Sequence, residues 1–372
     1  MGAVFLHGAL RDPDLRRIVL DRDASGVKSG FLPDHMVTLA QGGGHPHITP
    51  RAGANAVGAL LKGVSAQEVE RLDFYAAGWG DVPREVAVQS EGSVTHARAW
   101  FPQKTAVQPG PAFDLEEWQQ HFGALDRIAA TEVMEYFGSI APDELAARMP
   151  MIRARAASRI AATGMPTSLR SKAGADDIDE LASKTLHAGF YRSEERVLRH
   201  PTFTGGMSEV LHREVFVATD AALVLPYDPA RDRVLLVEQF RMGPYGRGDP
   251  HPWMLEPVAG RVDAGETPEE AAHRECREEA GLTLKRLERI ASYYCTPGNS
   301  TEYFHNFVGI ADLPDGLPRH GGLATEAEDL RLHVLGFEAA MGLLETGEAD
   351  NGPLILSLIW LARERGRLRA SA

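Results

Sequence analysis

Short hydrophobic runs separated by glycine-rich turns dominate the first hundred residues of the chain. Runs of this length and spacing predict short strands, which favour a small barrel or a curled mixed sheet. From residue 114 to about 165 the apolar positions recur every three or four residues instead, and this spacing predicts helices. Pro150 is expected to break one of these helices. The predicted strands are 3–6, 56–61, 86–88 and 96–101.

Strand patterns return in the second half of the chain. A partly alternating run at 211–218 precedes two apolar runs, 221–225 and 234–240, which are separated by a turn and predict a hairpin. The chain is therefore expected to have an α/β (α+β) fold in three parts. These parts are a first domain at 1–110, a helical linker region at 111–175 and a second domain at 176–372.

Charge and composition exclude several classes of protein. Asp and Glu number 52 against 39 Lys and Arg, so the net charge of −13 provides no bulk basic surface for nucleic acid. The apolar run 354–362 is too short to span a bilayer, which needs about 18 residues. Cys276 and Cys295 are too few for a disulfide framework, and the N-terminus lacks the basic region of a signal peptide. We therefore expect a cytoplasmic protein without nucleic-acid or membrane partners.

Residues 260–282 carry the densest group of chemically active side chains. Start and stop signals at the two ends predict a helix from about 268 to 280. Glu275, Glu278 and Glu279 share one side of this helix because they lie three and four positions apart. Like charges at this spacing repel one another, so the acids either face solvent or are neutralised by a cation. Mg²⁺ is a suitable cation because it prefers carboxylate oxygens.

The spacing of residues in this segment resembles the Nudix box, the signature of the Nudix hydrolases. The pattern is GX5EX7REUXEEXGU, where U is a bulky apolar residue, and a match at this many positions is far more specific than a short glycine motif. The resemblance implies an α/β/α sandwich with a mixed sheet. It also implies hydrolysis of a nucleoside diphosphate linked to another group, with Mg²⁺, or Mn²⁺ in its place. The matching residues are Gly260, Glu266, Arg274, Glu275, Cys276, Glu278, Glu279, Gly281 and Leu282.

The flanking segments resemble the ADP-ribose pyrophosphatases within that family, a subgroup that includes bacterial relatives labelled tellurite-resistance proteins. Residues 256–260 enter the box in the same way, and Pro297 lies 15 residues after Leu282. The acidic segment 322–329 resembles the loop that supplies the subgroup's catalytic glutamate. The resemblance therefore implies hydrolysis of ADP-ribose to AMP and ribose 5-phosphate.

The resemblance also implies roles for the acids around the box. Glu275, Glu279 and the backbone oxygen of Ala259 are expected to hold Mg²⁺. Glu278 is expected to take part in catalysis as an auxiliary ligand or as support for the ligands. Glu328 is expected to reach a second metal ion.

Further roles concern the attacking water and the substrate. Glu326 is expected to be the general base or to position the water, while Glu266 and Arg274 orient the helix and its loop. Arg241 ends a predicted strand and is expected to contact the diphosphate, because the arginine fork suits phosphate oxygens; a structural ion pair is the alternative. We expect a homodimer through the Nudix domain. Further substrate contacts, the first two across the dimer interface, are expected from Arg213, Glu214, Glu302 and Pro297.

The first domain carries a second resemblance. Gly8 follows the first predicted strand in a His-Gly-Ala-Leu sequence that resembles the YGxL opening of γ-glutamylcyclotransferase-like (AIG2-like) domains. Ala76 stands where that family has a catalytic glutamate, and His7 stands where tyrosine is usual. We therefore expect a small β-barrel-like domain without cyclotransferase activity. His45 and His47 suggest a metal site, but with no third ligand in view we expect a flexible loop.

ADP-ribose hydrolysis is the function that the sequence favours, and three alternatives stay open. The substrate is alternatively another nucleoside diphosphate sugar or a dinucleotide. A second alternative is a sensor that binds ADP-ribose without turnover and signals through the first domain, although the intact box and Glu326 favour turnover. The third makes the first domain the functional centre, and the alanine at position 76 argues against it.

Overall fold

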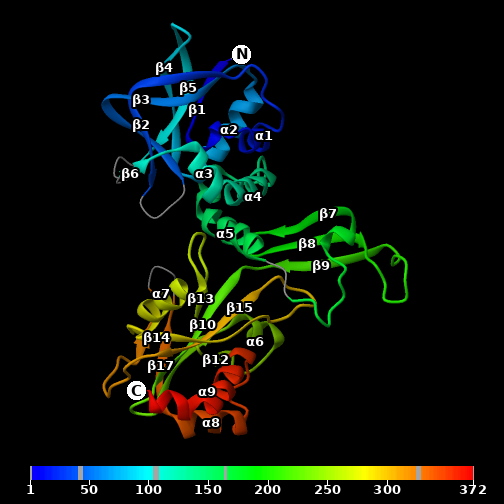
Figure 1. The fold of residues 1–372 in the computed structure, drawn as a ribbon, viewed down its shortest axis with the longest axis vertical. Helices are drawn as coiled ribbons and strands as arrows, with labels where there is room; N and C mark the ends of the chain where they lie inside the picture. Colours follow the sequence, from blue (N-terminus) through cyan, green and yellow to red (C-terminus); the bar gives the residue numbers. More distant parts are fainter. Residues whose placement is uncertain (1, 41–44, 104–108, 163–165, 324–327, 372) are drawn as a thin grey trace. The chain divides into compact units, whose positions relative to one another are not determined.

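The chain folds into two compact units, residues 1–165 and residues 166–372 (Figure 1). Each unit has its own sheet and its own hydrophobic core. The mixture of strands and helices confirms the predicted α/β (α+β) class. The structure is a computed structural model, which describes residues 2–40, 45–103, 109–162, 166–323 and 328–371.

A closed barrel of strands forms the centre of the first unit. The strands pair in the order β3-β1-β5-β4-β2, and β2 pairs again with β3, while β6 extends the sheet beside β2. Apolar side chains including Phe5, Leu60 and Phe101 fill its core. The small barrel predicted from the short apolar runs is therefore confirmed. Its strands are β1 (Gly2–His7), β2 (Lys28–Ala40), β3 (Pro46–Val64), β4 (Asp81–Ser90), β5 (Ser93–Pro102) and β6 (Pro109–Ala112).

Helices pack together at one side of the barrel. Helix α5 continues through Pro150, so the predicted break is wrong. Met149 and Ile152 flank the proline and are buried, and this packing offsets the roughly 3 kcal/mol that an interior proline costs. The helices are η1 (Gly8–Arg11), α1 (Pro13–Leu20), α2 (Ala66–Gly78), α3 (Leu115–His121), α4 (Gly123–Glu135) and α5 (Pro142–Ala161).

Asp12 joins the later helices of this unit to the beginning of the chain. Its carboxylate caps α1 by accepting the Leu15 N–H at 2.8 Å. The same carboxylate accepts hydrogen bonds from Arg127 Nη2 and Gln119 Nε2, both at 2.7 Å. Asp12 is 1% exposed, so these bonds form where water competes little. Helices α3 and α4 are therefore held to the first turn of α1.

The expectation of a flexible loop around His45 and His47 is wrong on two points. His47 lies in β3, where it pairs with Thr38 of β2. A third residue with a metal-ligating side chain, Asp81, lies beside both histidines at the start of β4. Asp81 is distant in sequence and comes close only when the barrel closes, so no local pattern reveals it.

A mixed sheet forms the centre of the second unit. Its main path is β14-β15-β10-β11-β17-β16, with β12 paired to β11 and β13 paired to β10. The β10–β15 pair is parallel and the β10–β11 hairpin is antiparallel, as the turn between them predicts. The strands are β10 (Asp220–Asp228), β11 (Arg233–Phe240), β12 (Trp253–Glu256), β13 (Val258–Arg261), β14 (Arg286–Tyr294), β15 (Tyr303–Ile310), β16 (His320–Gly321) and β17 (Leu330–Gly336).

Helices cover both faces of this sheet (Figure 1). Alternation along β10 sends Val224 to the core beneath α7 (Pro268–Ala280) and Leu225 to the core beneath α9 (Gly352–Ala370). Helix α8 (Phe337–Thr346) joins α9 on the second face, and the short α6 (Met242–Arg247) follows β11. The predicted α/β/α sandwich with a mixed sheet is confirmed.

A separate antiparallel sheet precedes the sandwich in the second unit. It is formed by β7 (Asp179–Ala188), β8 (Arg192–Arg199) and β9 (Leu211–Val217), and a short turn of helix, η2 (Ala175–Asp177), leads into it. Leu181, Phe190 and Tyr191 are each more than half exposed on or beside it. Across the described part of the chain, none of the helices has the length and apolar character needed to cross a membrane.

The contacts of Asp12 predict a measurable loss of stability on substitution. Asp12→Ala should lower the free energy of unfolding of the first unit by about 2–3 kcal/mol, because a cap is lost and the Arg127 guanidinium loses its main acceptor. Urea unfolding of the full chain measures this change. Asp14→Ala is the matched control, since Asp14 lies in the same turn with its side chain 60% exposed, and we expect a change of about 0.5 kcal/mol or less. An equal loss in both variants would contradict the role of Asp12.

Candidate active site

Helix α7 brings the acidic residues of the site against the sheet. Its Thr267 cap accepts the Glu270 N–H, while the Glu270 carboxylate accepts the Thr267 N–H. The helix ends at Gly281, whose φ of 64° suits glycine. The helix therefore spans 268–280, as predicted. Ala272 and Cys276 are fully buried, and burial raises the pKa of the Cys276 thiol, so this cysteine packs in the core.

Glu275 and Glu279 meet the backbone of β13. Glu279 is 2% exposed, and its Oε2 accepts the Ala259 N–H at 3.3 Å. Glu275 lies directly over Gly260, where an added Cβ would come within 1.8 Å of Glu275 Oε1. Any larger residue at position 260 would push the Glu275 carboxylate out of this place. The two carboxylates and the Ala259 backbone therefore lie together, and their role as metal ligands stays a prediction.

The buried Glu279 and the partly buried Glu275 bind protons more tightly than ordinary glutamates. Burial raises the pKa of Glu275 to about 6, although the Arg274 charge opposes the rise. Burial, together with the negative charges of Glu275 and Glu328, raises the pKa of Glu279 to about 8. Two adjacent buried anions are costly unless positive charge compensates them. Carboxylate oxygens beside a strand backbone form a donor set that fits Mg²⁺.

Arg274 connects the acids on the outer side of the site. Its Nε and Nη2 donate to the two carboxylate oxygens of Glu266 at 2.9 and 2.8 Å. Its Nη1 donates to Glu275 Oε1 at 2.6 Å and to Glu278 Oε2 at 3.1 Å. Its Nη2 also donates to the Arg261 carbonyl at 3.0 Å, which ties α7 to the end of β13. These contacts restrain the position of Glu275 and leave the Glu278 side chain 33% exposed.

The acidic segment before β17 contributes Glu328. Leu323 N–H donates to Glu328 Oε2 at 3.1 Å, and Glu328 N–H donates to the Leu323 carbonyl at 3.3 Å. The Glu328 charge acts on both Glu275 and Glu279, so this acid lies near the pair. Glu326, the predicted general base, lies outside the described residues.

Arg241 faces the site from the beginning of α6. Its Nε donates to Glu256 Oε2 at 2.9 Å, and its Nη2 lies 2.7 Å from the same oxygen. Gln239 Nε2 donates to that oxygen as well, at 3.2 Å. The Arg241 side chain remains 41% exposed, and its charge acts on Glu279. The ion pair that was the structural alternative is present, and the exposed fraction leaves the guanidinium accessible to a phosphate.

The remaining predicted substrate contacts lie in two places. Pro297 is exposed in the turn after β14, and Glu302 accepts a hydrogen bond from Cys295 Sγ at 2.9 Å at the other end of this turn. Arg213 and Glu214 are exposed on β9, in the separate sheet that β7 and β8 complete. None of the hydrogen bonds described for Arg213 and Glu214 joins them to α7.

Two residues important for this geometry escaped the sequence analysis. Glu256 marks only the start of a flanking segment in the sequence. In the folded chain its carboxylate accepts a hydrogen bond from the Arg241 guanidinium. Only the pairing of strands reveals this role of Glu256, because β11 and β12 run side by side with Val237 opposite Glu256. Gly321 is the second, because an added Cβ would come within 1.8 Å of the Glu279 carbonyl. Neither role follows from spacing along the chain.

Comparisons with known proteins identify the families that the two parts of the chain resemble. The NUDIX domain family model matches residues 217–358, and the model for gamma-glutamyl cyclotransferase, AIG2-like, matches residues 4–120. The ADP-ribose pyrophosphatase of Escherichia coli (strain K12) is 40% identical over 196 residues, which cover 53% of this chain and 93% of that protein. The GDP-mannose pyrophosphatase of Escherichia coli O1:K1 is 31% identical over 180 residues, which cover 48% of this chain and 87% of that protein.

A solved structure titled as an ADP compounds hydrolase aligns with 52% of this chain and 97% of its own, at 22% identity and a TM-score of 0.40. The predicted resemblances to Nudix ADP-ribose pyrophosphatases and to AIG2-like domains are both confirmed, while the tellurite-resistance subtype stays a prediction. The chain belongs to the Nudix family of hydrolases, with an AIG2-like domain preceding its Nudix domain.

Proposed function

We propose that this Nudix hydrolase cleaves the diphosphate of ADP-ribose, with Mg²⁺, to give AMP and ribose 5-phosphate. The observation that carries the proposal is the pair formed by the buried Glu279 and the partly buried Glu275 against the backbone of β13. Two weakly acidic carboxylates in one place favour a bound divalent cation over a purely structural role. Two free cysteines also favour a cytoplasmic location, where thiols stay reduced.

The groups that would hold Mg²⁺ are the carboxylates of Glu275 and Glu279 and the backbone oxygen of Ala259. Glu328 would bind a second metal ion. Mn²⁺ is the alternative ion, since it accepts the same oxygen ligands. When bound, the metal supplies charge that neutralises phosphate oxygens and lowers the pKa of a water. Arg274 keeps Glu275 over Gly260 by holding it at 2.6 Å, and it holds Glu278 at the rim.

The protein's own groups would orient the reacting atoms. The exposed part of the Arg241 fork contacts the diphosphate, while Glu256 fixes its direction. The water oxygen attacks one phosphorus, the bond to the bridging oxygen breaks, and the proton of the water passes to the Glu326 carboxylate. Support for Glu326 is its place in the sequence of the acidic segment 322–329, which resembles the loop that supplies the subgroup's catalytic glutamate.

The proposed homodimer would complete the substrate site. Leu181, Phe190 and Tyr191 leave an apolar surface exposed at the sheet of β7, β8 and β9, which a partner would cover. Arg213 and Glu214, also exposed there, would reach the partner's substrate, while Glu302 and Pro297 contact the substrate from within the chain.

The choice of ADP-ribose rests on the curated relatives. The ADP-ribose pyrophosphatase relative is 40% identical, against 31% for the GDP-mannose pyrophosphatase. GDP-mannose or another nucleoside diphosphate sugar is the second candidate, and binding of ADP-ribose without turnover is the third.

We expect the purified chain with Mg²⁺ to release AMP and ribose 5-phosphate from ADP-ribose faster than it cleaves GDP-mannose or dinucleotides. Chromatography of the products from such a panel measures this preference. Faster cleavage of another compound would keep the Nudix reaction and overturn the substrate. Binding of ADP-ribose with no product would favour the sensor.

Glu279→Gln should lower kcat by at least about 100-fold, because an amide replaces a carboxylate that is proposed to bind the metal. Steady-state hydrolysis at saturating Mg²⁺ measures the effect. Glu269→Gln is the matched control, since Glu269 is an exposed acid of the same helix and should leave kcat unchanged. Near-wild-type turnover in Glu279→Gln would remove the proposed metal role.

Mg²⁺ affinity should depend steeply on pH. The raised pKa values favour the neutral carboxyl forms at lower pH, so the ion must displace protons to bind. Between about pH 8 and about pH 6 the affinity should fall about tenfold per pH unit, and more steeply below the pKa of Glu275. Calorimetric titration of Mg²⁺ into the chain at several pH values tests this, and a flat profile would contradict it.

A further inference from the structure

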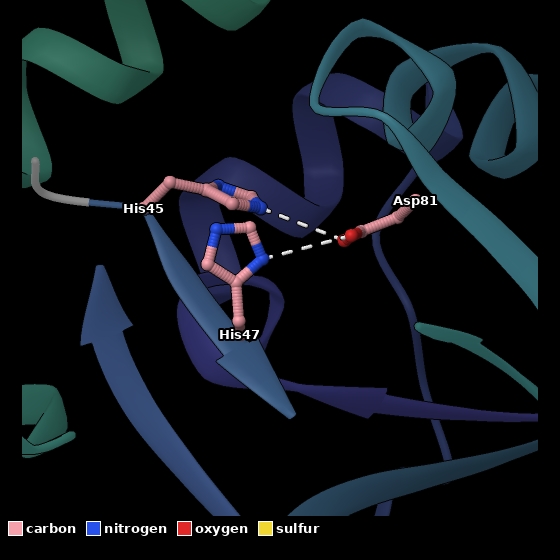
Figure 2. Close-up of side chains that lie close together, drawn as sticks. All are labelled: His45, His47 and Asp81. Carbon is pink, nitrogen blue, oxygen red and sulfur yellow. Dashed lines mark ion pairs between the residues drawn. The ribbon is translucent and has the colours of Figure 1, made fainter. Parts of the chain in front are cut away.

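A second group of metal-ligating side chains belongs to the first unit, whereas every residue assigned to hydrolysis belongs to the second unit. His45 immediately precedes β3, His47 lies within β3, and Asp81 begins β4 (Figure 2). One ligand atom from each of the three lies within 4.8 Å of the others. Figure 2 shows both imidazole rings turned toward the Asp81 carboxylate. The barrel therefore places two nitrogen ligands and one oxygen ligand around a common point.

The spacing of these atoms suits ligands of a shared ion better than direct partners. His45 Nε2 lies 3.6 Å from Asp81 Oδ2, and His47 Nδ1 lies 3.6 Å from Asp81 Oδ1. Both separations exceed an ordinary hydrogen bond. Two ligands about 2.0–2.1 Å from a tetrahedral zinc ion lie roughly 3.4 Å apart. These two separations are close to that edge length, and all three ligand atoms lie within 4.8 Å of one another.

The same atoms lack other partners. Within the described part of the chain, His45 Nε2, His47 Nδ1 and Asp81 Oδ1 are buried without a hydrogen bond. Asp81 is only 7% exposed, so its carboxylate is a charge removed from water. A buried polar group without a partner costs free energy, and a buried charge costs more. A cation among the three groups would satisfy all of them at once.

Neighbouring residues hold the two histidines in place. The Trp79 ring stacks on His45 with centroids 3.8 Å apart and planes inclined by 7°. Pro46, between the histidines, packs against the turn that follows β1. Gly8 in that turn has φ +57°, and an added Cβ would lie 2.5 Å from Pro46 Cγ. The glycine turn that resembles the cyclotransferase opening is thus in contact with the histidine segment.

One side of the group opens on a small cavity. Its volume is about 30 Å³, enough for about two water molecules, and His45, Asp81, His7 and Ala76 contribute to its lining. His7 Nε2 donates to the Trp100 carbonyl at 2.7 Å, which leaves its Nδ1 as an acceptor. Ala76 supplies no acid to this cavity. Three protein ligands and room for water form the arrangement of a metal site with an open position.

We propose that His45, His47 and Asp81 bind one divalent late first-row transition-metal ion, of which Zn²⁺ is the reference. Imidazole nitrogen selects zinc, cobalt, nickel or copper over Mg²⁺, which prefers oxygen. The site is chemically distinct from the Nudix acids, whose described ligand groups are carboxylates and a strand backbone. It gives the first unit a ligand-binding role that does not depend on the proposed hydrolysis.

The test uses Co²⁺ as a spectroscopic probe with the full chain, freed of metal by chelation and kept in excess Mg²⁺ to occupy oxygen sites. We expect one Co²⁺ per chain with the visible absorption of a four-coordinate ion. Binding should persist in Glu279→Gln, which alters only the proposed Mg²⁺ ligands. Absence of a bound Co²⁺ under these conditions would overturn the proposal.

Variants of the three residues identify the ligands. His45→Gln and Asp81→Asn should each weaken Co²⁺ binding by about 100-fold or more, because loss of a direct ligand exceeds the 10–100-fold cost of losing a supporting group. His96→Gln is the matched control, since His96 is exposed on β5 of the same barrel and should leave binding unchanged. Unchanged affinity in both His45→Gln and Asp81→Asn would also overturn the proposal.

Circular dichroism would reveal any variant that fails to fold. A measurement on the unaltered chain then tests the proposal without that variant. X-ray absorption of the zinc-loaded protein should show nitrogen and oxygen at about 2.0–2.1 Å, with outer scattering from two imidazole rings. An all-oxygen shell without imidazole scattering would contradict the assignment.

Discussion

The packing of two carboxylates against one strand, Glu279 buried and Glu275 partly buried, is the constraint on which the Nudix site depends. Glu275 and Glu279 lie where water is largely excluded, and each anion raises the cost of the other. Neighbouring residues lower the free-energy cost of placing these two carboxylates together. Gly260 leaves space for Glu275, the Ala259 N–H donates to Glu279, and Arg274 donates to Glu275 from the side. These features fit the proposed role of the pair as ligands of a divalent cation.

The sheet provides the rigidity that this arrangement needs. Helix α7 approaches the strands closely because its inward residues are small, including Ala271, Ala272 and Cys276. On the opposite face α8 and α9 bury larger residues such as Phe337 and Leu358. Strand β10 therefore sits between two cores, and β13 is fixed against it by backbone pairing. Side chains carried by packed elements keep their relative geometry better than side chains carried by loops.

The two units contain polar groups of different chemistry. The Nudix site gathers carboxylates and arginines, which suit hard cations and phosphates. The barrel gathers two imidazoles and one carboxylate, which suit softer ions. The resemblance of the barrel to cyclotransferases extends to its strands and its glycine turn, yet Ala76 lines the cavity without a carboxylate. The absence of cyclotransferase activity stays a prediction.

Local patterns were sufficient to predict α7, its acidic side and the β10–β11 hairpin, because capping signals and apolar spacing act between residues close in sequence. The sandwich was expected from the resemblance of residues 260–282 to the Nudix box. The barrel followed from short apolar runs, whereas α5 passes through Pro150 because distant packing outweighs a local preference. The burial of Glu279, the Glu256 partner of Arg241 and the place of Asp81 beside His45 required the folded chain. Each depends on strands or helices that come into contact only after folding, and the spacing of residues along the chain does not predict such contacts.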